Sequence, residues 1–101
     1  MASRLKLQSE LEELLGSRNV YFQPPESVKM KYPAIRYSLE RIENIHADDL
    51  SYKQLTAYEL TLIDYNPDSL YVSKILQLPY CRFDRSYPAD NLNHFTFTIY
   101  Y

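Results

Sequence analysis

The chain has 101 residues, which is enough for one domain and too few for two independent cores. Hydrophobic residues make up 46% and charged residues 24% of the sequence, so a folded globular protein is expected and extensive disorder is not. The net charge of −2 gives no basic surface for phosphate contacts, and a single glycine, Gly16, excludes a glycine-rich phosphate-binding loop.

The sequence carries one cysteine, Cys81, so an internal disulfide bond is impossible and a reducing compartment is expected. No apolar run approaches the roughly 20 residues that a membrane-spanning helix needs. The N-terminal segment is charged, without the apolar core of a signal peptide. We therefore expect a soluble protein without membrane contacts.

Residues 4–15 are predicted to form the first helix. Leu7, Leu11 and Leu14 recur at the spacing of one helix face, and Leu15 widens this apolar stripe. Gly16 follows at the position where helices commonly end in a left-handed conformation.

Three strands are predicted in the next part of the chain. A short one over residues 20–23 ends at two consecutive prolines, which donate no backbone hydrogen bond. Two longer ones, over residues 34–45 and 52–65, show apolar residues at every second position, such as Ile35 and Tyr37 in the first. Because the connection between the two long strands is short and acidic, a long antiparallel hairpin is the simplest arrangement.

The remaining segments complete the predicted fold. Asp68 is predicted to be the N-cap of a second helix that must end before Pro79, a length of about ten residues. Residues 80–93 are predicted to be an irregular loop or a poorly regular hairpin arm, followed by a last strand over residues 94–101. The predicted fold class is α+β: one mostly antiparallel or mixed β-sheet, in the element order α-β-β-β-α-β, with a long β-hairpin and two helices packed on one face.

Catalytic and metal-binding chemistry find little support in the sequence. His46 and His94 stand in no metal-ligand spacing, and Cys81 has no second cysteine for a CxxC pair. A Cys81–His94 nucleophile pair, in a small enzyme or ligand-binding domain, is one alternative. The simpler interpretation is a buried thiol and a histidine at a strand end. We expect a protein that is not an enzyme and that holds no metal and no cofactor.

The most unusual segment is 79–94, which interleaves aromatic, arginine, acidic and amide side chains. Arginine beside aromatic rings is typical of residues that dominate protein interfaces. The alternative is a surface loop whose Asp and Asn side chains satisfy its own backbone. The predicted interface residues are Tyr80, Arg82, Asp84, Arg85, Tyr87, Asp90, Asn91 and Asn93, with Asp48 and Asp49 from the acidic hairpin connection. The eleven tyrosines of the chain fit either an interface or ordinary strand positions.

Charge is unevenly distributed along the chain. Residues 40–68 carry seven acidic and two basic residues, a net charge of −5, which leaves +3 for the rest of the chain. An acidic hairpin on a more basic body allows head-to-tail contacts between identical copies, and such contacts close into rings where the rotation permits. Charges that protect strand edges from aggregation are the alternative explanation.

Several motifs resemble those of a family of small proteins from the head-to-tail gene region of tailed phages and prophages, the tail terminator or tail completion proteins. The similarity lies in Tyr21, Pro24–Pro25, Tyr32–Pro33 followed by Ile35 and Tyr37, Asn66–Pro67–Asp68, Arg82–Phe83–Asp84–Arg85 and Asp90–Asn91–Leu92–Asn93–His94. The segments that carry these motifs span about four fifths of the chain, and the first helix adds little. The motifs are specific as a set and are tied to no known chemistry.

The resemblance implies a structural virion protein with a helix-backed sheet and a β-hairpin arm. Such proteins form a homo-oligomeric ring, generally a hexamer, that caps the tail tube, stops its elongation and offers a surface to the head connector. The implied partners are its own copies, the tail tube protein and the connector or neck proteins, with DNA passing through the ring lumen. The implied location is the virion, after assembly in the host cytoplasm. A head-closure or neck adaptor is the alternative within the phage context, and a generic adaptor is the alternative outside it.

Overall fold

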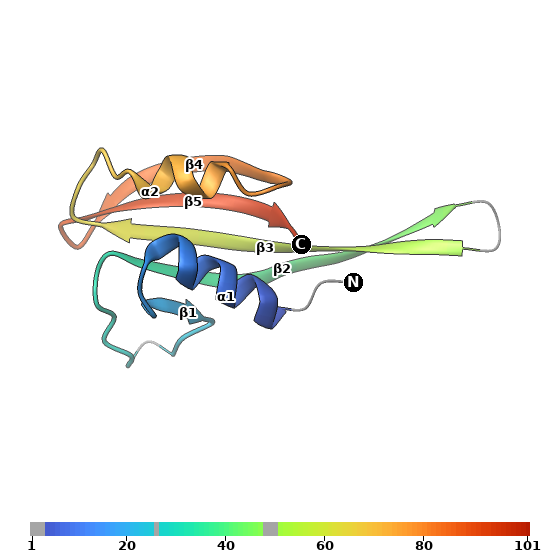
Figure 1. The fold of residues 1–101 in the computed structure, drawn as a ribbon, viewed down its shortest axis with the longest axis horizontal. Helices are drawn as coiled ribbons and strands as arrows, with labels where there is room; N and C mark the ends of the chain where they lie inside the picture. The colour runs from blue at the N-terminus through green and yellow to red at the C-terminus, as the bar shows by residue number, and fades with distance from the viewer. Residues whose placement is uncertain (1–3, 26, 48–50) are drawn as a thin grey trace.

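The computed structural model describes residues 4–25, 27–47 and 51–101. The elements in chain order are α1 (Arg4–Leu15), β1 (Val20–Phe22), β2 (Ala34–Ala47), β3 (Ser51–Asp64), α2 (Tyr71–Leu76), β4 (Cys81–Ala89) and β5 (Leu92–Tyr100). The strands form one sheet in the order β1-β2-β3-β5-β4, in which β1 is parallel to β2 and the other neighbours are antiparallel. The fold class is α+β, as predicted, with a mixed sheet and two helices in the described residues (Figure 1).

The first helix agrees with its predicted bounds. Leu7, Leu11 and Leu15 are buried against the sheet. Gly16 has a φ angle of 75°, and its backbone N–H donates to the carbonyl oxygen of Glu12 at 2.9 Å. Glycine adopts this left-handed conformation without the steric cost that a side chain would add, so it ends the helix where the sequence places it.

Helix α2 begins later than predicted, and Asp68 does not cap it. The N-cap position is Leu70, which makes no side-chain capping hydrogen bond. Asp68 donates its backbone N–H to Oδ1 of Asn66 at 2.9 Å, so it belongs to a turn before the helix. The helix has only six residues, and its one fully buried side chain is Ile75. Packing therefore holds this helix in place, because so short a segment has little helical stability of its own.

The segment 80–93 forms a regular hairpin, which agrees with the predicted hairpin arm and not with the alternative of an irregular loop. It forms strand β4 and the start of β5, joined by a two-residue turn at Asp90 and Asn91. Both turn residues have positive φ angles, 52° and 62°, the geometry of a tight hairpin turn that Asp and Asn tolerate well. The sheet therefore has one strand more than predicted, and the element order is α-β-β-β-α-β-β.

Both helices pack on the same face of the sheet and bury one core with it. The buried members of this core are Leu7, Leu11, Leu15, Val20, Ile35, Tyr37, Tyr58, Leu60, Leu62, Ile75, Phe95, Phe97 and Ile99. Tyr37 fastens α1 to β2, because its hydroxyl donates to Oε1 of Gln8 at 2.6 Å and accepts from Nη1 of Arg4 at 3.2 Å. The buried hydroxyl is therefore satisfied, as the interior of a folded protein requires.

Strands β2 and β3 extend beyond the rest of the sheet as a two-stranded hairpin, and we term its described residues, 40–47 and 51–56, the arm. β1 pairs with β2 only over residues 35–37, and β5 pairs with β3 only over residues 57–64. The molecule measures 51 × 25 × 23 Å, and the arm projects along its long axis (Figure 1). Both strand edges of the arm therefore lack a neighbouring strand in the described residues.

Candidate protein-interaction surface

The face of the sheet opposite the two helices is the candidate interaction surface, and we term it the open face. Side chains alternate between the two faces along each strand, so every second residue of the strands belongs to it. Its larger and polar members are Arg36, Ser38, Arg41, Glu59, Thr61, Arg82, Asp84, Arg85, Tyr87, His94, Thr96, Thr98 and Tyr100. Neither described helix packs on this face (Figure 1). Its exposed groups are mainly charged and aromatic, whereas Thr61, Thr96 and Thr98 on β3 and β5 are buried beneath them.

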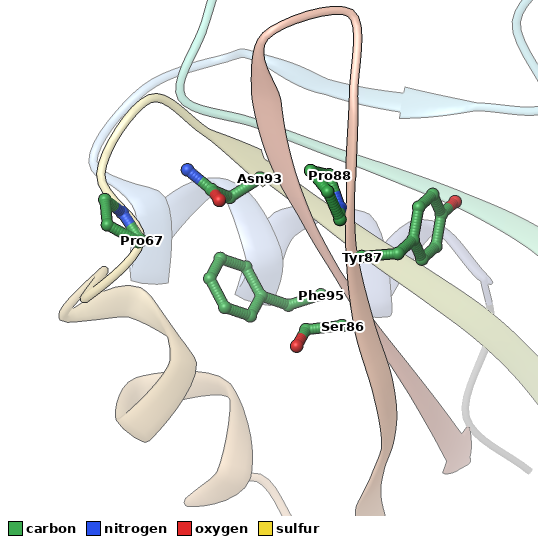
Figure 2. A pocket seen from close by; sticks show the side chains of 6 residues that line it. All are labelled: Pro67, Ser86, Tyr87, Pro88, Asn93 and Phe95. Carbon is green, nitrogen blue, oxygen red and sulfur yellow. The ribbon is translucent and has the colours of Figure 1, made fainter.

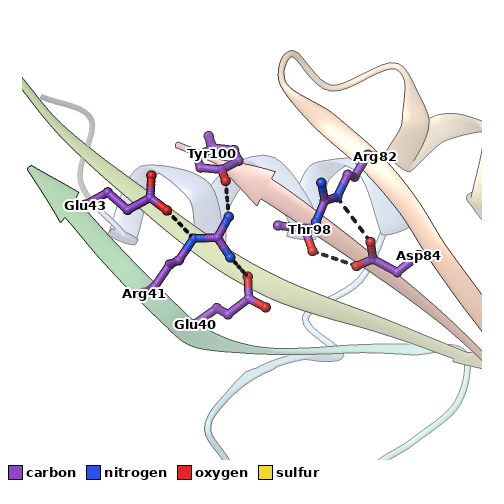
Figure 3. Close-up of polar contacts among 7 residues, drawn as sticks. All are labelled: Glu40, Arg41, Glu43, Arg82, Asp84, Thr98 and Tyr100. Carbon is purple, nitrogen blue, oxygen red and sulfur yellow. Dashed lines mark hydrogen bonds and ion pairs between the residues drawn. The ribbon is translucent and has the colours of Figure 1, made fainter. Parts of the chain in front are cut away.

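Arg41 connects the root of the arm to the body of the sheet (Figure 3). Its Nε donates to Oε1 of Glu43 at 2.7 Å, its Nη1 to Oε2 of Glu40 at 3.2 Å, and its Nη2 to the hydroxyl of Tyr100. The bond to Tyr100 crosses above Ala57, which lies between the two residues in the strand register and is fully buried. The hydrogen bond to Glu43 raises the pKa of Arg41, so the guanidinium stays charged. One cation thus holds the arm and its acidic groups in place.

A second polar cluster lies at the β4 side of the open face (Figure 3). Arg82 donates from Nε to Oδ1 of Asp84 at 3.2 Å, and Thr98 donates from Oγ1 to Oδ2 of the same carboxylate at 2.6 Å. The strand register shifts between Phe83 and Arg85, which makes Asp84 a bulge residue and places Arg85 on the same face as Arg82 and Asp84. An exposed ion pair of this kind adds little to stability. Its effect is to fix the direction in which the charges point.

Arg85, Tyr87 and His94 form a third group on the open face. The rings of Tyr87 and His94 are stacked, with centroids 5.0 Å apart and an interplanar angle of 14°. The guanidinium of Arg85 lies 5.0 Å from the centroid of the Tyr87 ring. Within the described part of the chain Arg85 makes no ion pair. Its charge is therefore available to a partner.

Part of the predicted interface set comes together on this surface. Its members on the open face are Arg82, Asp84, Arg85 and Tyr87. Strand alternation alone would have turned Arg85 away from Arg82 and Asp84, and the bulge brings it back to their face. Asp48 and Asp49, the acidic residues predicted in the hairpin connection, lie outside the described residues.

The other predicted residues lie at the two ends of β4. Tyr80 is in the turn that precedes the strand and is 83% exposed. Asp90 and Asn91 form the tight turn at the opposite end, and Asn93 donates from Nδ2 to the carbonyl oxygen of Tyr65 at 3.1 Å. Asn93 therefore braces the end of the β4–β5 hairpin. It does not belong to the open face.

The interface prediction missed residues contributed by the other strands. Arg36 of β2, Glu59 of β3 and Tyr100 of β5 share the open face with the β4 residues. The alternation that identified the core residues of each strand also places these three residues on the opposite face of the sheet. What the sequence did not show was that β4 lies next to β5, because β4 itself was not predicted.

A shallow depression of about 200 Å³ lies between the β4–β5 hairpin and the segment before α2 (Figure 2). It is lined by Pro67, Ser86, Tyr87, Pro88, Asn93 and Phe95. This lining includes no carboxylate, thiol, imidazole or amine, so the hydroxyls of Ser86 and Tyr87 have no general base beside them among the lining residues. Among the described residues no group of three or more His, Cys, Asp and Glu side chains converges in a way that could hold a metal ion.

The alternative Cys81–His94 pair is not assembled in the structure. Cys81 is paired with Ile99 and packs against the core, whereas His94 lies on the open face against Tyr87. The two side chains point to opposite sides of the sheet. Five positions along β5 separate their register points, a distance of about 16 Å at about 3.3 Å per residue. Proton transfer between the two groups is therefore impossible in this arrangement.

Cys81 is expected to be an unreactive thiol in the folded protein. Burial raises its pKa from 9.0 to about 11, with a smaller contribution from the negative charge of Asp84. Iodoacetamide labelling at pH 8 should therefore be at least about tenfold slower in the folded protein than in urea, because the thiolate is the reacting species. Labelling at equal rates in both states would contradict the burial of this residue.

The same shift predicts how stability depends on alkaline pH. The unfolded thiol ionises near pH 9 and the folded one near pH 11, so the contribution of Cys81 is complete below pH 9 and is lost as the pH rises through 11. A Cys81→Ala variant should lose less stability over this interval than the unmodified protein. Urea unfolding at a series of pH values measures the difference.

No protein-family model matches the chain, and a comparison with curated proteins finds no significant match to its sequence. In the described residues no helix has the length and apolar character required to cross a membrane. The candidate site is therefore described from its geometry alone. It consists of a face with exposed charged groups, a projecting arm and, in the described residues, strand edges without a neighbouring strand, which are features suited to binding other macromolecules.

Proposed function

We propose that this protein is a structural assembly subunit that binds copies of itself and a larger partner through its arm, its strand edges and its open face. The arm carries this proposal. Residues 40–47 and 51–56 project beyond the packed body, and their strand edges have no neighbouring strand in the described residues. A two-stranded hairpin alone is only marginally stable in water. Pairing with a strand of another chain would satisfy its free backbone groups.

The resemblance to phage tail terminator proteins supports a more particular proposal. In it, the protein forms a homo-oligomeric ring, generally a hexamer in that family, on the head-proximal end of the tail tube. Several of the motifs that carry the resemblance shape the surface described above. Arg82–Phe83–Asp84–Arg85 contains the β4 bulge, Asp90–Asn91 is the hairpin turn, and Asn66–Pro67–Asp68 is the turn before α2.

The proposed mechanism is a mismatch between two assembly faces. A tube grows because each ring presents a face with which the next ring pairs. A terminator reproduces one of these faces and lacks the other, so the last ring has no surface on which growth can continue. In this scheme the arm contacts tube subunits by strand pairing and side-chain packing, and the opposite side of the ring remains available to the head connector. DNA meets the protein only as it passes through the ring lumen.

Polymerisation of the cognate tail tube protein tests this function. Added at well below one copy per tube subunit, the protein should shorten the tubes and appear at one end of them in electron micrographs. Tubes of unchanged length with no bound protein would contradict the terminator proposal. Unchanged tubes together with binding to the purified head connector would assign the neck adaptor role instead.

A further inference from the structure

Two exposed apolar patches lie at opposite edges of the sheet. The first, termed the β4 patch, consists of Leu76, Tyr80 and Phe83, which are 42%, 83% and 44% exposed. Leu76 ends helix α2, Tyr80 is in the turn that follows, and Phe83 points to the helix side of β4, where its ring contacts Phe97. Large apolar side chains grouped at a strand edge are unusual on a protein that works alone.

The second patch, termed the β2 patch, consists of Leu39 and Ile42 at the root of the arm. These side chains are 44% and 55% exposed. Leu39 is paired with the core residue Tyr58, and Ile42 is paired with Thr56 beyond the bulge at Glu40. Arg41, between them, points to the open face. The β2 patch is therefore on the helix side of the sheet, as the β4 patch is.

The backbone beside each patch lacks a neighbouring strand in the described residues. β4 is the last strand of the sheet and pairs only with β5. β2 has β1 as a neighbour only over residues 35–37. Beyond these residues, the backbone N–H of Leu39 donates a hydrogen bond to Oε1 of Gln23 at 3.2 Å. From Glu40 onward this edge of β2 is open.

The charges on the open-face side of these two edges are opposite in sign. β4 carries Arg82 and Arg85 against one acid, Asp84, a net charge of +1. The root of the arm carries Glu40 and Glu43 against one base, Arg41, a net charge of −1. The two edges are thus complementary on both faces of the sheet, with apolar groups on the helix side and opposite charges on the open side.

We propose that the β4 edge of one copy docks on the β2 edge of a second copy, so that the sheet continues from subunit to subunit. The contact joins different surfaces of the two copies, and repeating it closes a ring where the rotation permits. Pro88 and the bulges at Asp84 and Glu40 keep the strand pairing short, so side chains provide most of the specificity. This inference rests on the self-association in the proposed function and assigns the surfaces that produce it.

Charge reversal on each edge, followed by mixing, tests the proposal. One variant carries Arg82→Glu and Arg85→Glu, and the other carries Glu40→Arg and Glu43→Arg. Each variant alone places like charges across the contact, so its self-association should weaken at least about tenfold in sedimentation velocity. An equimolar mixture should recover the assembly, because each edge then meets a neighbour of opposite charge. A control with Arg18→Glu and Lys29→Glu, both exposed and outside the strands, should assemble like the unmodified protein.

A cross-linking measurement keeps the test independent of any loss of stability in these variants. In a Cys81→Ala background, Phe83→Cys and Ile42→Cys are placed in separate proteins and mixed under mild oxidation. The contact predicts disulfide-linked dimers that contain one copy of each variant. No mixed dimers, or charge-reversed variants that each assemble normally, would overturn the proposal.

The results separate this inference from the proposed function. Assembly that is lost and recovered by the charge-reversed pair, without any effect on tube length, supports the edge contact and counts against a tail terminator. Normal self-assembly of both variants with loss of tube binding would mean that the edges receive a strand of the tube protein. That outcome would overturn the edge contact between copies and leave the terminator role in place.

Discussion

Replacement of Phe97 by alanine is expected to lower the free energy of unfolding by about 3–5 kcal/mol, the range typical of a large cavity in a core. Phe97 is fully buried on β5 and lies against the ring of Phe83 at 5.6 Å between centroids. Small domains have only about 5–15 kcal/mol of stability in total. The variant should therefore be folded at low temperature and largely unfolded at moderate urea concentration.

Phe83→Ala is the matched control for this experiment. The two phenylalanines face each other across β4 and β5, but Phe83 is 44% exposed. Its replacement should cost about 1 kcal/mol, since part of its surface is never removed from water. Urea unfolding followed by far-UV circular dichroism gives both values. If the two variants were equally stable, the assignment of Phe97 to the centre of the core would be wrong.

Shortening the arm is expected to abolish assembly while leaving the fold intact. In the variant, residues 42–56 are replaced by Asn-Gly, a dipeptide suited to a two-residue hairpin turn between Arg41 and Ala57, which are paired in the structure. The buried core residues that the structure describes all lie outside this segment. The variant loses Ile42 and Glu43 from the β2 edge, and we expect its self-association and tube binding to weaken at least about 100-fold.

The other hairpin provides the control for the shortened arm. Asp90→Asn with Asn91→Gly keeps the tight turn between β4 and β5. Asparagine and glycine adopt the positive φ angles that Asp90 and Asn91 have in the structure. This variant should keep both its thermal unfolding midpoint and its assembly. A shortened-arm protein that unfolds at the same temperature as the unmodified chain and still assembles would remove the arm from the mechanism.

The periodicity of hydrophobic residues explains which elements could be predicted from the sequence. Leucine spacing defined α1, and Gly16 marked its end, because helix periodicity and the left-handed cap are both local properties. The long hairpin followed from strict alternation in two neighbouring segments. Its register in the structure pairs Ile35 with Leu62 and Tyr37 with Leu60, which are the residues that alternation places on the core side.

Strand β4 was missed because its pattern is interrupted. The bulge at Asp84 shifts the alternation by one residue in the middle of the strand, and Pro88 opposes a strand assignment. Asp90–Asn91 was the available signal, since two such residues between extended segments are typical of a tight hairpin turn. Asp68 was wrongly predicted as a helix cap because Asn66 binds its backbone N–H before the helix begins.

The candidate surface could be predicted only in part for a related reason. Arg82, Asp84 and Arg85 are close in sequence, but their common orientation depends on the bulge. Arg41 and Tyr100 are 59 positions apart and meet through the pairing of three strands. Composition therefore pointed to a segment that contributes to the open face, whereas the extent of that face required the strand order.

Self-assembly of the unmodified protein is tested by sedimentation velocity over a wide concentration range. If the β4 edge of each copy binds the β2 edge of the next, the copies close into a ring. The expected result is one closed species with a mass several times the 12.0 kDa of a single chain. A 12.0 kDa particle at every concentration up to the solubility limit would contradict it. Exposed edges, arm and open face would then have some purpose other than self-assembly.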